Sequence, residues 1–471
     1  MSEQRQAIKE NAQYLRNVRP IDPEEIYEYV DGQPHPAVVR ETLRDLSLEL
    51  DLIEREDGTF VPAPEGPVST DFHGVESFPE AYARELEDLL VAEFGPGWPE
   101  GTSGDRLRER LATLKEAYFE QHEVAYDELT ALAYAIYHLP DNYAVTQYVL
   151  APLIREGQMP SRLRVLDVGA GTGGPALGLA DLLPTDALVE YHAVEPSANA
   201  DVLESMLEET GRNFHTTIHR ERAQEFEPEG TFDIVLFANV LNELDDPASV
   251  VREYGEWLAD DGSLVAIEPA DRNTATGLRR VERTVEDDFT VYAPTCRLWP
   301  SATPAVDPWS FDRRPDLEAP AFQQRLDDAA GDEFESGTFV NSDVQFAYSI
   351  LRTDGAERIG YTPDRSRVAP LADAEDLLTD RIDLVAIKLS HDLSDGGNPL
   401  FVLSDGSERE RVFAVLTNES LLTRDLLDSP YGGLLDIENA LVLWNDDEGA
   451  FNLVIDDEAV VDDASPPSLR G

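Results

Sequence analysis

Residues 163–174 read LRVLDVGAGTGG, and this stretch constrains the fold more than any other part of the chain. The apolar run 163–168 has the character of a strand buried inside a parallel sheet. The glycines after it permit a tight turn and a close approach of the backbone to a ligand at the start of a helix. Glu195 ends the next apolar run, where the second strand of a doubly wound sheet presents a carboxylate to ribose hydroxyls.

Two kinds of ligand fit such a turn, and a turn without any ligand is the third interpretation. Gly169, Gly171 and Gly174 satisfy the dinucleotide-binding fingerprint. Asp167 argues against it, because a carboxylate two residues before the first glycine would repel a pyrophosphate. It would favour a ligand with ammonium and sulfonium charges, such as S-adenosylmethionine. The pattern D-x-G-x-G-x-G resembles motif I of the class I methyltransferases. We predict these cofactor-binding residues: Asp167, Gly169, Ala170, Gly171, Gly173, Glu195, Glu225 and Asn239.

The charge balance is extreme. The chain has 471 residues, a length typical of about three domains. Its 37 basic and 95 acidic residues give a net charge of −58. Acidity of this extent is typical of a halophilic protein in a salt-rich cytosol, where a Debye length of about 3 Å weakens the repulsion of a polyanion. The charge therefore says more about the solvent than about partners.

The remaining composition narrows the class of protein. The single cysteine, Cys296, excludes a disulfide within the chain. No histidine has ligand spacing with cysteines or acids, so we predict no metal site. No apolar run is long enough to cross a membrane, and no signal peptide is evident. We expect a cytoplasmic protein without membrane contact.

Composition and periodicity predict five segments. They are a winged-helix-like domain (1–75), a helical cap (76–157), a doubly wound α/β domain with a seven-stranded Rossmann-like sheet (158–392), a small OB-like β-barrel (393–463) and a disordered tail (464–471). The first domain would contain helices over 2–16, from Pro23 and over 36–50, then a hairpin turning at Asp57-Gly58. Arg40 and Arg44 on its third helix lie among acidic residues, which disfavours DNA binding.

The strands of the α/β domain and of the barrel are expected at regular intervals. Sheet strands are predicted at 163–168, 188–194, 215–219, 232–238, 263–268, 344–352 and 382–389, the last pair antiparallel. Barrel strands are predicted at 400–403, 412–417, 440–444 and 451–455. Aromatic residues of the barrel could stack on bases, but we expect Phe413, Trp444 and Phe451 in the core. In the cap, Pro140 is expected to separate two helices.

Polar residues follow the fourth sheet strand, at the edge where ligands bind in doubly wound folds. We predict Asn239, Asn242 and Glu243 as catalytic residues that face the methyl group and its acceptor, with Glu243 as a candidate general base. The alternative is that they cap the following turn and helix. Glu268, at the end of the fifth strand, is a further ligand-side carboxylate.

Several ordered segments resemble the Rsm-type small-ribosomal-subunit methyltransferase-like family of mitochondria and bacteria. The segments are Ala133-Tyr134-Ala135, 138–144 (HLPDNYA), 241–244 (LNEL), 293–296 (APTC), 309–311 (WSF) and 343–348 (DVQFAY). The resemblance covers residues 110–390 and implies a class I methyltransferase that acts on the small ribosomal subunit or its rRNA. The family often holds an iron–sulfur cluster through four cysteines. Only Cys296 matches, with Trp299, Ser310 and Ser390 at the other positions, so no iron–sulfur cluster is predicted.

Three functions stay open at this point. The first is an S-adenosylmethionine-dependent methyltransferase for rRNA or another small-subunit component. The second is a catalytically silent assembly factor of the small subunit on a methyltransferase scaffold, because no recognisable acid–base set is present. The third is a DNA-binding regulator that uses the winged helix, and the mixed charge of the third helix makes it the weakest.

Overall fold

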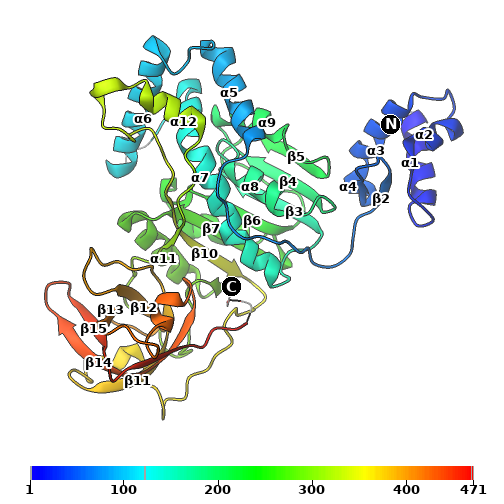
Figure 1. The fold of residues 1–471 in the computed structure, drawn as a ribbon. Helices are drawn as coiled ribbons and strands as arrows, with labels where there is room; N and C mark the ends of the chain where they lie inside the picture. Colours follow the sequence, from blue (N-terminus) through cyan, green and yellow to red (C-terminus); the bar gives the residue numbers. More distant parts are fainter. Residues whose placement is uncertain (1–2, 121–123, 468, 470–471) are drawn as a thin grey trace. The chain divides into compact units, whose positions relative to one another are not determined.

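The computed structural model describes residues 3–120, 124–467 and 469 (Figure 1). The chain divides into two units, Met1–Ile234 with Leu317–Ser342, and Val235–Asp316 with Asp343–Gly471. The strands of the α/β part follow the order β5-β4-β3-β6-β7-β10-β8, with β9 paired to β10. No helix among the described residues is long and apolar enough to cross a membrane.

The first unit begins with short helices and a hairpin. In chain order these elements are α1 (Glu3–Leu15), α2 (Pro23–Ile26), η1 (Tyr27–Tyr29), α3 (Pro36–Asp45), α4 (Ser47–Leu50), β1 (Leu52–Glu54) and β2 (Phe60–Pro62). Asp22 caps α2 by accepting a hydrogen bond from the Glu24 amide (2.9 Å). Gly58 turns the hairpin with a φ of +80°. The elements therefore form where the sequence predicted them, except that the third helix is interrupted at Leu46.

Three longer helices follow, namely α5 (Glu80–Phe94), α6 (Gly101–Glu120) and α7 (Glu128–Arg155). The prediction that Pro140 would separate two helices was wrong, because α7 continues through Pro140 and Pro152. A proline inside a helix costs about 3 kcal/mol. Nineteen of the 28 residues of α7 are buried, and this burial outweighs the lost backbone hydrogen bonds.

The α/β part of the first unit contains three parallel strands. β4 (Leu188–Val194) pairs with β3 (Arg162–Val168) and with β5 (Phe214–His219). The helices α8 (Gly174–Leu182) and α9 (Asn199–Leu207) follow β3 and β4, and α12 (Ala321–Asp328) and η3 (Gly331–Glu333) complete the unit. α8 packs on α7 at a distance that only glycine permits, because a Cβ on Gly178 would meet the Tyr143 carbonyl oxygen at 2.5 Å. The predicted strands of this part are confirmed to within one residue.

The sheet strands of the second unit are antiparallel around β10. The elements are β6 (Phe232–Ala238), which begins in the first unit, η2 (Leu241–Glu243), α10 (Pro247–Gly255), β7 (Leu258–Pro269), α11 (Arg272–Val285), β8 (Thr290–Ala293), β9 (Asp312–Arg314) and β10 (Val344–Arg352). β10 pairs antiparallel with both β7 and β8. The prediction that 382–389 is the seventh strand was therefore wrong, because the short strand β8 takes that place.

The barrel consists of β11 (Arg381–Lys388), β12 (Leu400–Ser404), β13 (Arg411–Leu416), β14 (Leu434–Asn445) and β15 (Ala450–Ile455). Its strand order β11-β12-β13-β15-β14 closes through an additional β11–β14 pairing, and β13 and β15 are parallel. This is a five-stranded Greek-key barrel of the OB type. Short elements, η4 (Leu371–Asp373) and α13 (Asp425–Asp428), and an added strand, β16 (Val460–Asp463), belong to the same unit.

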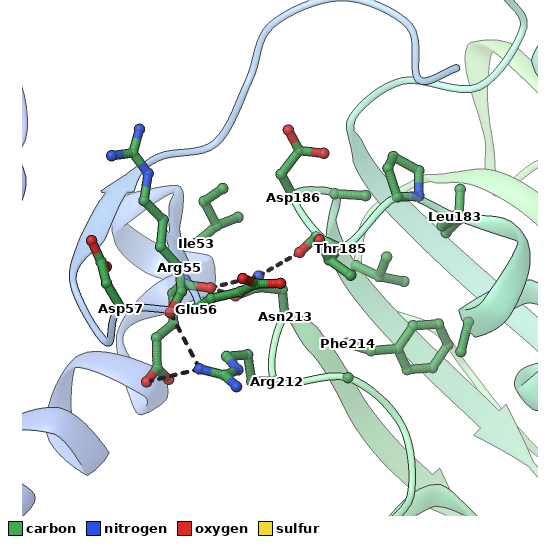
Figure 2. Close-up of a pocket in the computed structure, with 16 residues that line it drawn as sticks. Ile53, Arg55, Glu56, Asp57, Leu183, Thr185, Asp186, Arg212, Asn213 and Phe214 are labelled. Carbon is green, nitrogen blue, oxygen red and sulfur yellow. Dashed lines mark hydrogen bonds and ion pairs between the residues drawn. The ribbon is translucent and has the colours of Figure 1, made fainter. Parts of the chain in front are cut away.

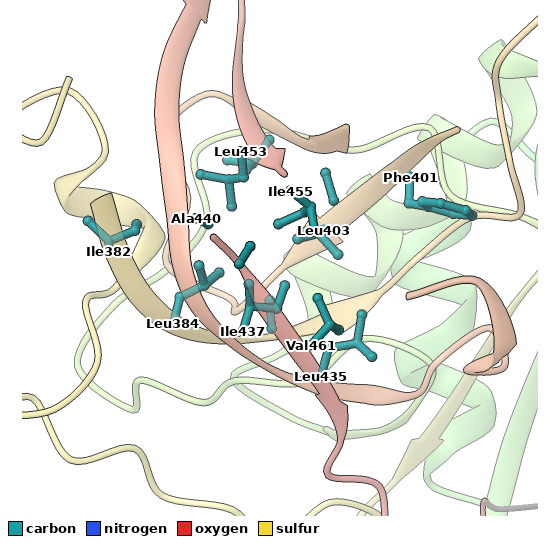
Figure 3. Close-up of a cluster of buried hydrophobic side chains, with 14 of the residues drawn as sticks. Ile382, Leu384, Phe401, Leu403, Leu435, Ile437, Ala440, Leu453, Ile455 and Val461 are labelled. Atoms are coloured by element: carbon teal, nitrogen blue, oxygen red, sulfur yellow. The ribbon is translucent and has the colours of Figure 1, made fainter. Parts of the chain in front are cut away.

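A dry core explains why segment 382–389 joins the barrel rather than the other sheet. Leu384 of β11 packs in this core with Leu403, Leu435, Ile437 and Leu453, all at most 1% exposed (Figure 3). The barrel therefore starts at Arg381 rather than at residue 393. Phe451 also lies in the core cluster as expected, whereas Trp444 is 40% exposed.

The expected disordered tail, 464–471, begins with a packed residue. Ser465 is 1% exposed, and its hydroxyl accepts a hydrogen bond from the Leu434 amide (2.9 Å). Residues 468, 470 and 471 lie outside the described residues. At Ser465, pairing with the start of β14 replaces the expected disorder.

Candidate functional site

The turn after β3 has the backbone conformation that its glycines predict. Gly169, Gly171 and Gly173 have φ values of +74°, +56° and +98°, which strain any residue with a Cβ. The amides of Gly169 and Ala170 donate to the carbonyl oxygen of Val194, at 2.8 and 3.2 Å. The turn is therefore fastened to the carboxyl end of β4.

The glycines of the turn differ in how closely other atoms approach them. A Cβ on Gly171 would have only ordinary contacts, with the nearest atom, Tyr134 Cε1, at 3.9 Å. A Cβ on Gly173 would meet Leu203 Cδ1 at 2.9 Å, and one on Gly174 would meet Asn142 Cβ at 2.6 Å. At Gly171 the positive φ rather than lack of space requires glycine, whereas Gly173 and Gly174 let neighbouring side chains and helices approach closely. Gly174, the third glycine of the dinucleotide fingerprint, serves helix packing here.

Glu195 holds the turn directly. One of its carboxylate oxygens accepts a hydrogen bond from the Gly171 amide (2.9 Å). The other accepts from the Ser197 amide (2.9 Å) and from the Ser197 hydroxyl. The side chain is buried, and its remaining lone pairs can still accept from a ligand hydroxyl. The structure thus brings Glu195 and the glycine turn together, as the sequence predicted.

Asp167 lies at the end of β3 and is completely buried. Its Oδ2 accepts a hydrogen bond from the Tyr191 hydroxyl, but Oδ1 has no partner among the described residues. Burial raises the pKa of Asp167 to about 7, which the hydrogen bond from Tyr191 opposes. A buried carboxylate oxygen without a partner is costly unless a ligand or water satisfies it. The hydroxyl of Thr172, in the same turn, is also buried without a partner in the described part of the chain.

Sequence reasoning missed the contribution of α7. Tyr134 approaches Gly171, and its hydroxyl accepts a hydrogen bond from Asn142 Nδ2 (3.3 Å). The ring of Tyr126 packs edge-on against Tyr134, with centroids 5.8 Å apart, and the Tyr126 carbonyl oxygen accepts from the Ala198 amide (3.4 Å). The Tyr134 ring therefore lies beside the turn on the α7 side, and Tyr126 packs against it. The segments 133–135 and 138–144 were the available signal, but a single sequence does not show that they meet the glycine turn.

The other predicted residues are less closely tied to this turn. Glu225 is exposed in the connection after β5, and the structure gives it no contact with the turn. In the second unit, Asn239 has a φ of +59°, and its amide donates to the Ile267 carbonyl oxygen (2.8 Å). Asn242 and Glu243 are exposed on η2. The catalytic roles of Asn239, Asn242 and Glu243, and the adenine contact of Glu225, stay predictions.

Glu268 supports the turn that carries these residues. It is 1% exposed, and its Oε1 accepts a hydrogen bond from the Leu241 amide (2.9 Å). Burial raises the pKa of Glu268 to about 8, and its Oε2 has no partner within the described ranges. Glu268 therefore fixes the start of η2.

The four positions expected to hold an iron–sulfur cluster in the resembling family do not fit one here. Ser310 and the Tyr431 hydroxyl share a hydrogen bond (2.7 Å), and Ser390 Oγ accepts from the Val402 amide (2.8 Å). Trp299 Nε1 donates to Asp405 Oδ2 (2.7 Å), and burial raises the pKa of the Cys296 thiol. One thiol and two hydrogen-bonded serines supply no thiolate set. Among residues 3–120, 124–467 and 469, no group of three or more His, Cys, Asp or Glu side chains could hold a metal ion.

A pocket of 630 Å³ lies in the first unit, away from the glycine turn (Figure 2). Ile53 and Arg55 of the hairpin line one side, and Asn213 and Phe214, at the start of β5, line another. Asn213 fixes the hairpin here, because its side chain accepts from the Glu54 amide (2.8 Å) and donates to the Glu54 carbonyl oxygen (3.1 Å). The pocket lies at the amino ends of the parallel strands, whereas ligands of doubly wound folds bind at the carboxyl ends.

A match to a known family agrees with the strand order and with the glycine turn. Residues 166–264 match the family model described as a methyltransferase domain. Fold and match together define a class I methyltransferase domain, the class whose methyl donor is S-adenosylmethionine. Residues 5–56 and 372–464 match the N-terminal and C-terminal domains of a domain of unknown function (DUF8157). Among curated proteins, none matches the chain.

Several methyltransferases of known structure are similar to parts of the chain. The sugar N-methyltransferase KedS8 from Streptoalloteichus sp. ATCC 53650 is 23% identical, over 26% of this chain and 47% of that one, with a TM-score of 0.22. The mitomycin 7-O-methyltransferase MmcR is 15% identical, over 56% and 75%, with a TM-score of 0.24. Magnesium protoporphyrin IX methyltransferase from Synechocystis PCC 6803 is 15% identical, over 44% and 88%, with a TM-score of 0.27. The chain thus spans about half the length of KedS8.

Proposed function

We propose that this protein binds S-adenosylmethionine at the turn after β3 and transfers its methyl group to rRNA or another component of the small ribosomal subunit. The observation that carries the first part is the unpartnered, buried Oδ1 of Asp167 beside a glycine turn held by Glu195. A cationic ligand at the turn would be the counter-ion for this buried carboxylate, which has none in the described part of the chain. When bound, S-adenosylmethionine supplies an electrophilic methyl group on a sulfonium sulfur.

The residues of the chain have separable roles in this proposal. The absence of a side chain at Gly171 would let the ligand approach the backbone of the turn. Asp167 attracts the charged methionine part of the ligand, and Glu195 accepts hydrogen bonds from ribose hydroxyls while it holds the Gly171 amide. Tyr134 excludes water on the α7 side of the turn. Rate acceleration would come mainly from alignment of donor and acceptor.

The ribosomal part of the proposal is supported by the ordered segments that resemble the Rsm-type family. Two of these segments, 133–135 and 138–144, lie on α7, and they include Tyr134 and Asn142, which approach the glycine turn. Two segments that resemble the family thus contribute residues to the candidate site. The four-cysteine cluster is the part of the family pattern that this chain lacks.

Calorimetric titration with S-adenosylmethionine tests the cofactor. We expect saturable binding by the wild type and a loss of at least about tenfold in affinity for Asp167→Asn, since the variant removes a buried charge that the ligand would satisfy. Asp181→Asn is the matched control, because Asp181 also accepts hydrogen bonds from tyrosine hydroxyls, those of Tyr82 and Tyr143, both at 2.8 Å. No binding by the wild type, or equal losses in both variants, would contradict the proposal.

Mapping of methylated nucleotides tests the substrate. Ribosomes from a strain that lacks the protein should miss one methyl mark in small-subunit rRNA, and a plasmid copy should restore it. The Asp167→Asn copy should not restore the mark. If rRNA marks are unchanged but small-subunit precursors accumulate, the protein is an assembly factor and the substrate assignment fails.

A further inference from the structure

A pocket of 270 Å³ lies in the second unit, on the outer face of the barrel. Phe401, Leu403 and Val412 point into the barrel core. Because side chains alternate along a strand, Val402 and Phe413 point outward, and both line the pocket. The pocket is therefore built on the second and third strands of the barrel, β12 and β13.

The connecting segments of the barrel close the sides of this pocket. Leu393 lies in the connection between the first and second strands, and Glu448 lies between the fourth and fifth strands. In OB barrels, the face of the second and third strands and these two connections form the surface that binds oligonucleotides or oligosaccharides. The pocket thus occupies the position at which this architecture holds a ligand.

A tryptophan from outside the barrel forms a further wall. Trp309 is half-buried, and its Nε1 donates to the Ala270 carbonyl oxygen (2.8 Å). Its ring is stacked on Phe311, with centroids 5.0 Å apart and an interplanar angle of 29°. The indole is therefore held in place before any ligand binds, which lowers the entropy cost of stacking a planar group on it.

The charges at the rim limit what the ligand can be. Arg411 is occupied, because it donates to the Glu448 carbonyl oxygen and lies 6.0 Å from the Phe413 ring centroid. Arg272, at the start of α11, is exposed, and its guanidinium has no hydrogen bond or ion pair with residues that the structure describes. Arg272 is thus the cation of the lining that is available to a ligand, while Glu408 and Glu448 are acidic residues of the same lining. The net charge of −58 gives no long-range attraction to a polyanion.

We propose that this pocket binds one unpaired nucleotide of a single-stranded nucleic acid, with the base stacked on Trp309 and one phosphate paired with Arg272. The planar wall suits a base, and the single free guanidinium suits one phosphate. This inference does not require an active methyltransferase domain, and it adds a nucleic-acid contact that lies outside the glycine turn.

Binding of fluorescein-labelled hexanucleotides, read as anisotropy with the full-length protein, tests the proposal. RNA and DNA versions of U6/T6 and A6 distinguish the sources of the nucleotide. Trp309→Ala should weaken binding by about tenfold or more, the range for loss of one stacked base. Trp309→Phe, which keeps an aromatic face, should retain most of the affinity. Trp444→Ala is the matched control, since Trp444 is exposed on β14 of the same barrel but does not line the pocket.

The salt dependence of oligonucleotide binding is a second, independent test. One phosphate contact predicts a slope of about −0.7 for the logarithm of the binding constant against the logarithm of the salt concentration. Arg272→Ala should bring this slope close to zero, whereas Arg424→Ala, at an exposed arginine paired with Asp428, should not change it. Absence of binding to all four oligonucleotides, binding that Trp309→Ala leaves intact, or a steep slope would overturn the proposal. Calorimetry with S-adenosylmethionine on Trp309→Ala separates the two sites. Unchanged cofactor binding by this variant would show that its loss of oligonucleotide binding does not come from damage to the cofactor site.

Discussion

Asp167 provides a quantitative test of the candidate site, because its burial has a predictable effect on stability. The pKa of its carboxyl is about 7 in the folded protein, compared with 3.8 for the exposed group. A raised pKa means that the folded state binds a proton more tightly than the unfolded state. Stability is therefore greatest at low pH and is lost as the pH rises towards and through 7.

The size of this loss follows from the two pKa values. From pH 5 to about pH 7, the folded state keeps a proton that the unfolded state has released. Over these roughly two pH units the free energy of unfolding falls by about 1.4 kcal/mol per pH unit, which gives about 3 kcal/mol, and it changes little from there to pH 8.5. Asp167→Asn has no carboxyl to ionise. The free energy of unfolding of the variant minus that of the wild type should therefore rise by about 3 kcal/mol over this pH range. Other titrating groups cancel in the difference.

Hydrogen exchange of peptides from β3 and β4, compared between variant and wild type at each pH, measures the local free energy of opening. The control is Asp354→Asn, because the hydrogen bonds from Arg352 hold the pKa of Asp354 at about 2, and its charge is constant over the same pH range. A difference that changes by less than about 1 kcal/mol for Asp167→Asn, or one that falls with pH, would refute the reasoning that burial dominates at this carboxyl.

Three further predictions concern the turn, the α7–α8 contact and the barrel. Glu195→Gln should weaken S-adenosylmethionine binding by about tenfold in calorimetry, because a charged acceptor is lost, while Glu190→Gln, on the strand β4 that precedes Glu195 but paired with Arg164, should not. Gly178→Ala should destabilise the protein by about 1–3 kcal/mol in thermal unfolding, because its Cβ would lie 2.5 Å from the Tyr143 carbonyl oxygen. Gly277→Ala, in the open interior of α11, should be neutral or stabilising by up to about 1 kcal/mol, and equal effects of the two variants would contradict the packing argument. Burial lowers the pKa of Lys388 to about 8, so the unfolded state binds more protons above that pH and barrel stability should rise from pH 8 to pH 10. Lys388→Met should abolish this rise in scanning calorimetry, and a rise that persists would exclude Lys388 as its source.

Much of the candidate site was predictable because it is local in sequence. The strand, the left-handed glycines and the acid at the end of the next strand occupy residues 163–195, and each has a distinct residue pattern. The role of Tyr134 was not predictable in this way, because its contact with Gly171 joins a helix to a turn 37 positions away in the sequence. The position of Asp167 near the ligand follows from the sequence, but the hydrogen bond from Tyr191 does not.

Sequence alone determined which segments become strands, since apolar runs and turn residues act over a few positions. It also determined the left-handed turn, since only glycine adopts those backbone angles without strain. Tertiary structure decided which sheet each strand joins: Arg381–Lys388 entered the barrel, and Thr290–Ala293 took the place beside β10. It also decided that α7 continues through Pro140. Strand partners and helix continuity depend on the total burial that distant segments achieve together, and no local pattern records that sum.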